Sequence, residues 1–163
     1  MPLNVVLGPE ILATLASERE HKFKGIMGVL KALRRKGVIE VYYPRAAGEA
    51  VGEEVIKELT EELGVRELPR AKDLGPCGRY LFEELRKGLD EERKRHLEVL
   101  SDILSSEVEV SIVVSTEDVK GLVHDALEVL GRKEECAELL GRLKSIRFLT
   151  LKEARELLMK FVV

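Results

Sequence analysis

The 163-residue chain is 45% hydrophobic and 35% charged, a balance that excludes a disordered polypeptide and favours one globular domain over residues 1–163. Its formal net charge of −3 excludes the positive field of a general nucleic-acid-binding protein, so any contact with nucleic acid must come from a local patch. Asn occurs once, Gln and Trp are missing, and Glu, Lys and Arg are abundant, a bias typical of hyperthermophile proteins.

Four short apolar segments rich in Val and Ile are predicted to be strands, and helical segments separate them. This alternation favours a parallel sheet with helices on both faces. We therefore predict an α/β fold: a three-layer α/β/α sandwich with a short, mainly parallel central sheet of four to five strands. The expected elements in chain order are strand 3–7, a helix starting at Pro9, helix 22–36, strand 38–43, helix 50–63, a loop over 65–78, helices 79–86 and 91–105, strand 108–115, helices 117–130 and 133–143, strand 146–149 and helix 152–161.

The order of the strands in the sheet follows from short, right-handed connections. The simplest arrangement places the first strand centrally, the second on one side, and the third and fourth on the other. The winding then reverses between the first and third strands, whose carboxyl ends flank the crevice where a doubly wound protein binds ligand. Those ends are Gly8 and residues 115–118.

The first residues lack the charged segment and long apolar run of a signal peptide, and no apolar stretch is long enough to span a bilayer. We therefore expect a cytoplasmic protein without a membrane partner. Cys77 and Cys136 stand far apart and outside any CxxC pair, so zinc is not expected. They are either two ordinary small residues or a disulfide, which cytosolic proteins of hyperthermophiles do contain.

Three short motifs stand at the predicted strand ends, and one acidic residue stands in the helix before the third strand. Residues 5–10 read Val-Val-Leu-Gly-Pro-Glu, and residues 43–49 read Tyr-Pro-Arg-Ala-Ala-Gly-Glu. Glu98 stands in the helix, and residues 113–118 read Val-Val-Ser-Thr-Glu-Asp. These motifs and the order of elements resemble the PIN domain, a family of small metal-dependent ribonucleases, over nearly the whole chain. The family opens with Val-Val-Leu-Asp, so Gly8 stands here in place of an aspartate.

The resemblance implies a site in which carboxylates hold Mg²⁺ or Mn²⁺ beside a scissile phosphate. Its metal ligands would be Glu49, Glu98 and Asp118. Thr116 would orient Asp118 or a water, and it completes the implied catalytic set. Because Gly8 removes the central ligand, we expect a PIN-like protein that binds or acts on RNA with weak or no nuclease activity. If active, it would be a Mg²⁺- or Mn²⁺-dependent endoribonuclease that hydrolyses phosphodiesters.

Each of these residues also has a purely structural interpretation. Gly8 and Pro9 suit the start of a helix, and residues 115–118 suit the cap and acidic first turn of another helix. Glu49 and Glu98 fit solvated acids on charge-rich helices.

Other residues near the expected crevice are equally open to two interpretations. The basic clusters at residues 31–36 and 93–96 either hold phosphates or form solvated helix faces. Tyr42 and Tyr43 end the second strand, where they either stack on bases or pack in the core. Glu10 either reaches towards the lost aspartate position or complements the helix dipole.

Two non-catalytic alternatives remain. The first is an α/β module that binds a small anionic ligand at the turn after the first strand, where Gly8 and the helix start would expose backbone N–H groups. The second is an assembly protein that forms a homodimer through an exposed apolar helix stripe. That stripe would consist of Leu157, Leu158, Met159, Phe161, Val162 and Val163.

Overall fold

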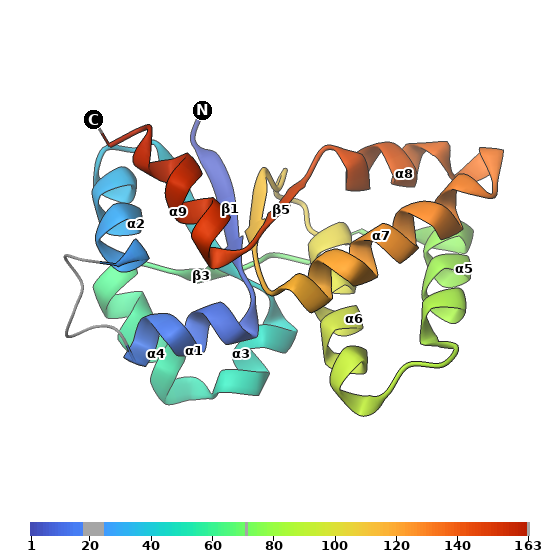
Figure 1. Cartoon of the computed structure of the whole chain (residues 1–163), viewed down its shortest axis with the longest axis horizontal. Coiled ribbons are helices and arrows are strands. Elements are labelled where there is room, and N and C mark those ends of the chain that lie inside the picture. Colours follow the sequence, from blue (N-terminus) through green and yellow to red (C-terminus); the bar gives the residue numbers. More distant parts are fainter. Residues whose placement is uncertain (18–24, 71, 163) are drawn as a thin grey trace.

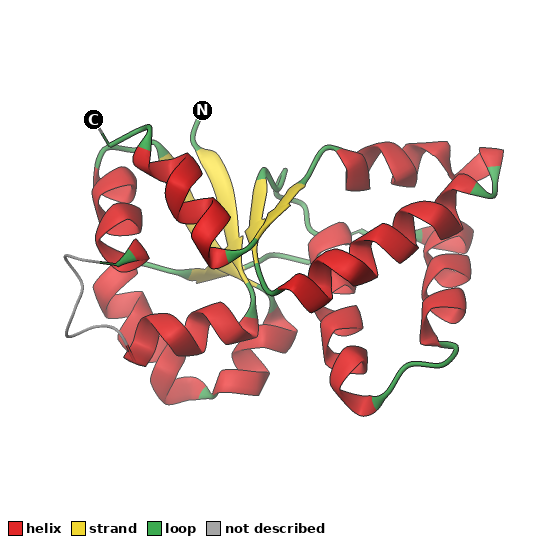
Figure 2. Cartoon of the chain, viewed as in Figure 1, coloured by secondary structure: helices red, strands yellow, loops and turns green. Residues whose placement is uncertain are grey.

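A parallel five-stranded sheet runs through the protein, whose computed structural model describes residues 1–17, 25–70 and 72–162. The strand order is β3-β2-β1-β4-β5, and every neighbouring pair is parallel. Figure 2 shows the strands lying between two groups of helices. The strands are β1 (Leu3–Leu7), β2 (Ile39–Tyr43), β3 (Arg66–Glu67), β4 (Ile112–Val114) and β5 (Arg147–Leu149). The predicted α/β class is confirmed, and so is the central position of the first strand.

The short edge strand β3 falls within the segment 65–78, which the sequence predicts to be a loop. Its two residues, Arg66 and Glu67, are exposed and pair with Tyr42 and Tyr43 of β2. Two exposed charged residues carry no apolar alternation, which is the pattern that marks a strand in a sequence. The prediction of a loop over 65–78 is therefore wrong at these two residues, and also at residues 75–78, which form the first turn of the helix Gly75–Arg86.

The helices differ most from the prediction after β2, and the predicted helix 133–143 begins as a 3₁₀ turn over Glu134–Cys136. The predicted helix 50–63 is two helices, α3 and α4, which are separated at Gly52; its φ of 92° is a conformation that favours glycine. The small residues Ala46 and Ala47 of α3 give it little apolar periodicity, so its start at residue 45 escaped prediction. Residues 22–24 of the predicted helix 22–36 lie outside the described residues. The helices are α1 (Pro9–Ser17), α2 (Ile26–Arg35), α3 (Arg45–Val51), α4 (Glu53–Leu63), α5 (Gly75–Arg86), α6 (Glu91–Leu104), α7 (Glu117–Gly131), α8 (Ala137–Lys144) and α9 (Leu151–Met159), with a 3₁₀ turn η2 (Glu134–Cys136) before α8.

The hydrophobic core has two parts that meet at α6. The larger part joins the sheet to α1, α2, α4 and α9, and the smaller part lies among α5, α6, α7 and α8. Figure 1 shows these two groups of helices on opposite sides of the strands. Val99 and Ile103 of α6 belong to the larger part, whereas Leu100 and Leu104 belong to the smaller one. Helix α6 therefore packs against both parts of the core, and its remaining face is available to line a site.

A disulfide joins Cys77 of α5 to Cys136 of η2, with their Cα atoms 5.6 Å apart. Cys136 is 1% exposed and belongs to the smaller part of the core. The sequence left two interpretations of the cysteines open, and the structure decides for the disulfide. It holds α5 against the helices that follow β4.

The C-terminal apolar residues mostly close the core. Leu158 is fully buried, and Leu157 and Val162 pack against the larger part of the core. Met159 and Phe161 are 40% and 46% exposed, and Val163 lies outside the described residues. The homodimer therefore stays a prediction, and of the proposed stripe only Met159 and Phe161 are exposed among the described residues.

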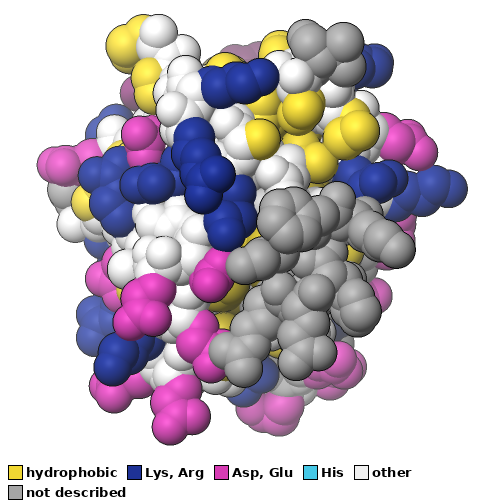
Figure 3. All heavy atoms as spheres, turned by 90° about the vertical axis from the view of Figure 1, so that its left-hand side faces the viewer, with side chains coloured by type: hydrophobic (Ala, Val, Ile, Leu, Met, Phe, Trp, Pro, Cys, Tyr) yellow, Lys and Arg dark blue, Asp and Glu magenta, His cyan; other side chains and the backbone are white. Residues whose placement is uncertain are grey.

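Figure 3 views the side of the molecule that carries α2 and α4, where cationic, acidic and a few hydrophobic side chains are intermixed. Among the described residues, no helix is both long enough and apolar enough to cross a membrane.

Candidate functional site

The carboxyl ends of β1 and β4 lie side by side, as the predicted topology requires. The N–H of Gly8 donates to the carbonyl oxygen of Val114 at 2.9 Å, and the N–H of Ile11 donates to the carbonyl of Gly8 at 3.1 Å. Pro9 has no N–H to offer. The small-anion alternative relied on free N–H groups at this turn, and the turn uses most of them internally.

Four side chains gather polar atoms at these strand ends, and we call them the strand-tip cluster: Glu10, His96, Ser115 and Thr116. Nε2 of His96 lies 2.6 Å from Oε1 of Glu10, and His96 is only 3% exposed. Oε2 of Glu10, Nδ1 of His96 and both hydroxyl oxygens are buried without a hydrogen-bond partner among the described residues. Thr116 is the N-cap of α7, yet its side chain makes no capping bond.

The electrostatics of the cluster favour a charged pair. The hydrogen bond that His96 donates to Glu10 raises the pKa of His96 against the opposing effect of burial, and the charge of Asp118 adds to the rise. The same hydrogen bond lowers the pKa of Glu10. The contact between His96 and Glu10 ties α6 to α1, and its electrostatics favour the protonated form of His96 beside the acidic groups at the strand ends.

The Glu10–His96 pair gives stability a defined pH dependence. The lowered pKa of Glu10 stabilises the fold at pH values above the ordinary carboxyl pKa of 4.5. The raised pKa of His96 stabilises the fold at pH values below the ordinary imidazole pKa of 6.5. We therefore expect the coupling between Glu10→Gln and His96→Leu to be largest between these values and to fade as the pH rises through the raised pKa of His96. The expected maximum is about 1 kcal/mol, because solvent reaches Glu10. Denaturant unfolding of the wild type, both single variants and the double variant measures it, and a coupling that stays constant into alkaline pH contradicts the charged pair.

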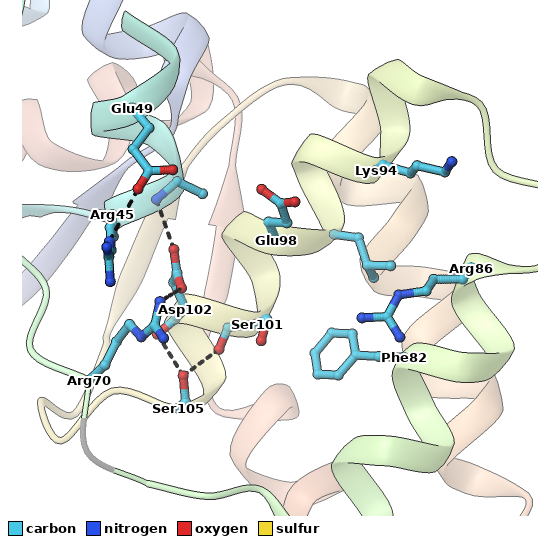
Figure 4. A pocket seen from close by; sticks show the side chains of 12 residues that line it. Arg45, Glu49, Arg70, Phe82, Arg86, Lys94, Glu98, Ser101, Asp102 and Ser105 are labelled. Carbon is cyan, nitrogen blue, oxygen red and sulfur yellow. Dashed lines mark hydrogen bonds and ion pairs between the residues drawn. The ribbon is translucent and has the colours of Figure 1, made fainter. Parts of the chain in front are cut away.

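A second site, which we call the basic groove, lies between α3, α5 and α6. It consists of two adjoining cavities of about 560 Å³ each, which share Arg70, Phe82, Arg86, Ser101 and Ser105. Figure 4 shows side chains from α3, from the loop before α5, and from α5 and α6 around the first cavity. Six cationic residues and four acidic residues line the groove: Arg45, Arg70, Lys72, Arg79, Arg86 and Lys94, with Glu49, Asp73, Glu98 and Asp102.

Half of the groove cations are already engaged. Arg45 pairs with Glu49 at 3.2 Å, Arg70 pairs with Asp102 at 3.3 Å, and the Lys94 ammonium lies 2.8 Å from Glu91. Lys72, Arg79 and Arg86 have no acidic partner within 4.0 Å in the part of the chain that the structure describes. These three cations are available to a ligand, and their charge selects an anionic one.

Asp102 holds the groove together. It is 6% exposed, and its Oδ2 accepts the N–H of Ala46 at 2.9 Å in the first turn of α3. Its Oδ1 accepts from Arg70 at 3.3 Å. The carboxylate of Asp102 therefore accepts a backbone N–H that has no partner within α3, at the helix end where the dipole favours a negative charge. The same carboxylate also anchors the loop before α5.

The structure brings only part of the predicted catalytic set together. Glu49 and Glu98 both line the first cavity of the groove, Glu49 from α3 and Glu98 from α6. Thr116 belongs to the strand-tip cluster, and Asp118 follows it in the first turn of α7; neither residue lines either groove cavity. No group of three or more His, Cys, Asp or Glu side chains in the described ranges is arranged to hold a metal ion. The Mg²⁺ or Mn²⁺ site therefore stays a prediction.

The two basic clusters and the two tyrosines have different outcomes. From the cluster 93–96, Lys94 lines the groove, while Arg93 lies 3.8 Å from Asp125 on α7 and His96 is buried. In the cluster 31–36, Lys31 pairs with Glu62 of α4, and its residues line neither cavity of the groove.

Tyr42 is a core residue, since it is 8% exposed and its hydroxyl accepts from Arg66 at 2.9 Å. Tyr43 instead lines a cavity of its own beside α3. The structural reading therefore holds for Tyr42, whereas Tyr43 keeps its possible role in stacking.

Sequence reasoning missed several groove residues. Arg70 and Lys72 come from a segment predicted as a featureless loop, and Arg86 and Arg79 are ordinary charged positions on a predicted helix. No spacing within the chain marks them, because the groove forms only when this loop, α5 and α6 pack together.

The chain was also compared with known proteins. No protein-family model matches it, and no curated protein sequence matches it significantly.

Proposed function

We propose that the protein binds single-stranded RNA in the basic groove and cleaves it weakly or not at all. The observation that carries this proposal is the presence of Lys72, Arg79 and Arg86, without acidic partners among the described residues, in one groove of a chain whose net charge is −3. Cations placed in this way bind a phosphate backbone through charge and counterion release. The choice of RNA follows the resemblance to the PIN domain.

The expectation of weak cleavage rests on the surroundings of the acidic residues. Arg45 and Arg70 pair with Glu49 and Asp102, so protein cations already supply the positive charge that a metal ion would bring to these carboxylates. Gly8 offers no carboxylate at the end of β1. A metal site that lacks its central ligand binds the ion poorly and stabilises the transition state less.

Fluorescence anisotropy with a labelled single-stranded RNA tests the binding. We expect measurable affinity at low salt that falls as salt rises, with a slope of about −2 in log K against log salt, which corresponds to about three phosphate contacts. A duplex DNA of equal length serves as the comparison. Undetectable RNA binding at low salt, or RNA binding that salt does not weaken, contradicts the proposal.

Restoring the carboxylate at the end of β1 tests the proposed loss of activity. A Cβ on Gly8 would lie 3.4 Å from the carbonyl oxygen of Val114 and 3.6 Å from Cβ of Ser115, which are ordinary van der Waals contacts, so the backbone accepts a side chain at this position. We expect Gly8→Asp to gain Mn²⁺-dependent cleavage of single-stranded RNA by about tenfold or more, because it adds a hard oxygen ligand.

Gly8→Asn is the matched control, since it has the same shape without the charge, and a chelator should abolish the gain. If Gly8→Asp neither cleaves RNA nor binds Mn²⁺ more tightly than Gly8→Asn, the relic of a metal site is refuted while RNA binding is untouched.

A further inference from the structure

A separate cavity of about 540 Å³ adjoins the basic groove on the other side of α3. It lies where β2 and β3 end and α4 begins, and it shares Arg45 and Glu49 with the groove. An RNA strand that follows the groove past Arg45 therefore reaches this cavity.

Tyr43, the last residue of β2, provides the cavity with an aromatic surface. Its ring lies against the backbone of α3 at Gly48, where an added Cβ would come within 2.8 Å of Cε2 of the ring. Ile56 of α4 lines the same cavity. A ring held between a strand end and a helix backbone is a rigid, flat contact for a nucleobase, and stacking of this kind contributes about 1–3 kcal/mol per base.

The polar groups of the cavity are mostly hydrogen-bond acceptors. Glu53 and Glu67 line it and have no ion-pair partner within the described residues, and Lys57 is its one lysine. Burial raises the pKa of Tyr43, and the nearby charge of Glu67 raises it further. Both carboxylates line the same cavity as the ring of Tyr43.

Among the four bases, guanine matches this set of groups best. Its Watson–Crick edge carries two adjacent donors, N1–H and N2–H, which a carboxylate accepts together, and its O6 accepts from an ammonium group such as that of Lys57. Adenine and cytosine present a donor next to an acceptor, and uracil presents one donor between two acceptors. A carboxylate beside the stacking surface therefore disfavours these three bases.

We propose that this cavity holds a guanine base of the RNA strand bound in the basic groove. The inference rests on the proposed function and extends it from phosphate contacts to base preference. Tyr43 stacks on the base, Glu53 and Glu67 accept from its Watson–Crick edge, and Lys57 donates to O6.

Short RNAs test this preference. The probes are uridine oligomers of about eight nucleotides, unsubstituted or with one internal G, A or C. We expect the G-containing oligomer to bind about tenfold more tightly than the other three. The double variant Glu53→Gln/Glu67→Gln should bind all four oligomers alike, and Tyr43→Leu should do the same, whereas Tyr43→Phe keeps the preference. Glu54→Gln/Glu61→Gln is the matched control, because it removes the same charge from α4 at positions outside the cavity.

The possible results separate the two proposals. Loss of the G preference in Glu53→Gln/Glu67→Gln but not in Glu54→Gln/Glu61→Gln supports the guanine pocket. Equal binding of all four oligomers by the wild type overturns the guanine pocket and leaves RNA binding in the groove intact. Failure of every oligomer to bind overturns RNA binding itself.

Discussion

The double variant Arg79→Glu/Arg86→Glu is expected to bind single-stranded RNA about 100-fold more weakly than the wild type at low salt. Both arginines line the basic groove from α5, and neither has an acidic partner within 4.0 Å among the described residues. One unit charge about 7 Å from a phosphate is worth about 2 kcal/mol at an effective dielectric constant of about 20. Reversal replaces this attraction with a repulsion, and screening by salt reduces the difference.

The salt dependence of RNA binding provides a second measurement on the same variant. Each lost phosphate contact lowers the slope of log K against log salt by about 0.7, so the double variant should show a slope shallower by about 1 to 1.5. Its free energy of unfolding should stay within about 0.5 kcal/mol of the wild-type value, because neither side chain has an acidic partner within the described part of the chain.

The matched control is Lys144→Glu/Lys152→Glu, which changes the net charge equally at exposed positions on α8 and α9. We expect this control to lose only a few-fold in affinity. If it weakens binding as much as Arg79→Glu/Arg86→Glu does, the RNA responds to net charge and the groove is not the binding site.

Removing the disulfide is expected to cause the largest loss of stability. Cys77→Ala/Cys136→Ala releases a link between residues separated by 59 positions. The chain-entropy relation for a loop of this length gives a loss of about 4 kcal/mol in the free energy of unfolding. In a protein of this size we expect the melting temperature to fall by about 8–16 °C. Calorimetry of the variant, with reduced wild type as the comparison, measures the change.

The location of the disulfide makes the effect specific. Cys136 is buried in the smaller part of the core, and Cys77 lies in the first turn of α5, the helix that carries Arg79 and Arg86. The lost stability should therefore concentrate in α5 and its neighbours, and hydrogen exchange should show faster opening there than in β1 or β2. A melting temperature within about 2 °C of the wild-type value would show that packing alone holds α5 in place.

The outcomes at individual residues show which inferences from sequence are reliable. The runs Val5–Leu7 and Ile112–Val114 are apolar throughout, as strands buried on both faces must be, and their positions near the middle of the sheet followed from chain order. Glu49 and Glu98 were selected from short motifs, and both line the groove. Asp118 was selected in the same way and stands at another place, because the direction of a side chain on a helix depends on how that helix packs.

The chain by itself determined the α/β class, the central first strand and most helix positions, because local apolar periodicity and right-handed connections govern them. Only the tertiary structure decided the pairing of Glu10 with His96, the disulfide, and the assembly of the basic groove. Residues 86 positions apart share a 2.6 Å contact in the strand-tip cluster, and no local pattern encodes such a contact. Charges that look interchangeable along the chain acquire different roles once packing gives some of them partners and leaves others, such as Arg86, facing a groove.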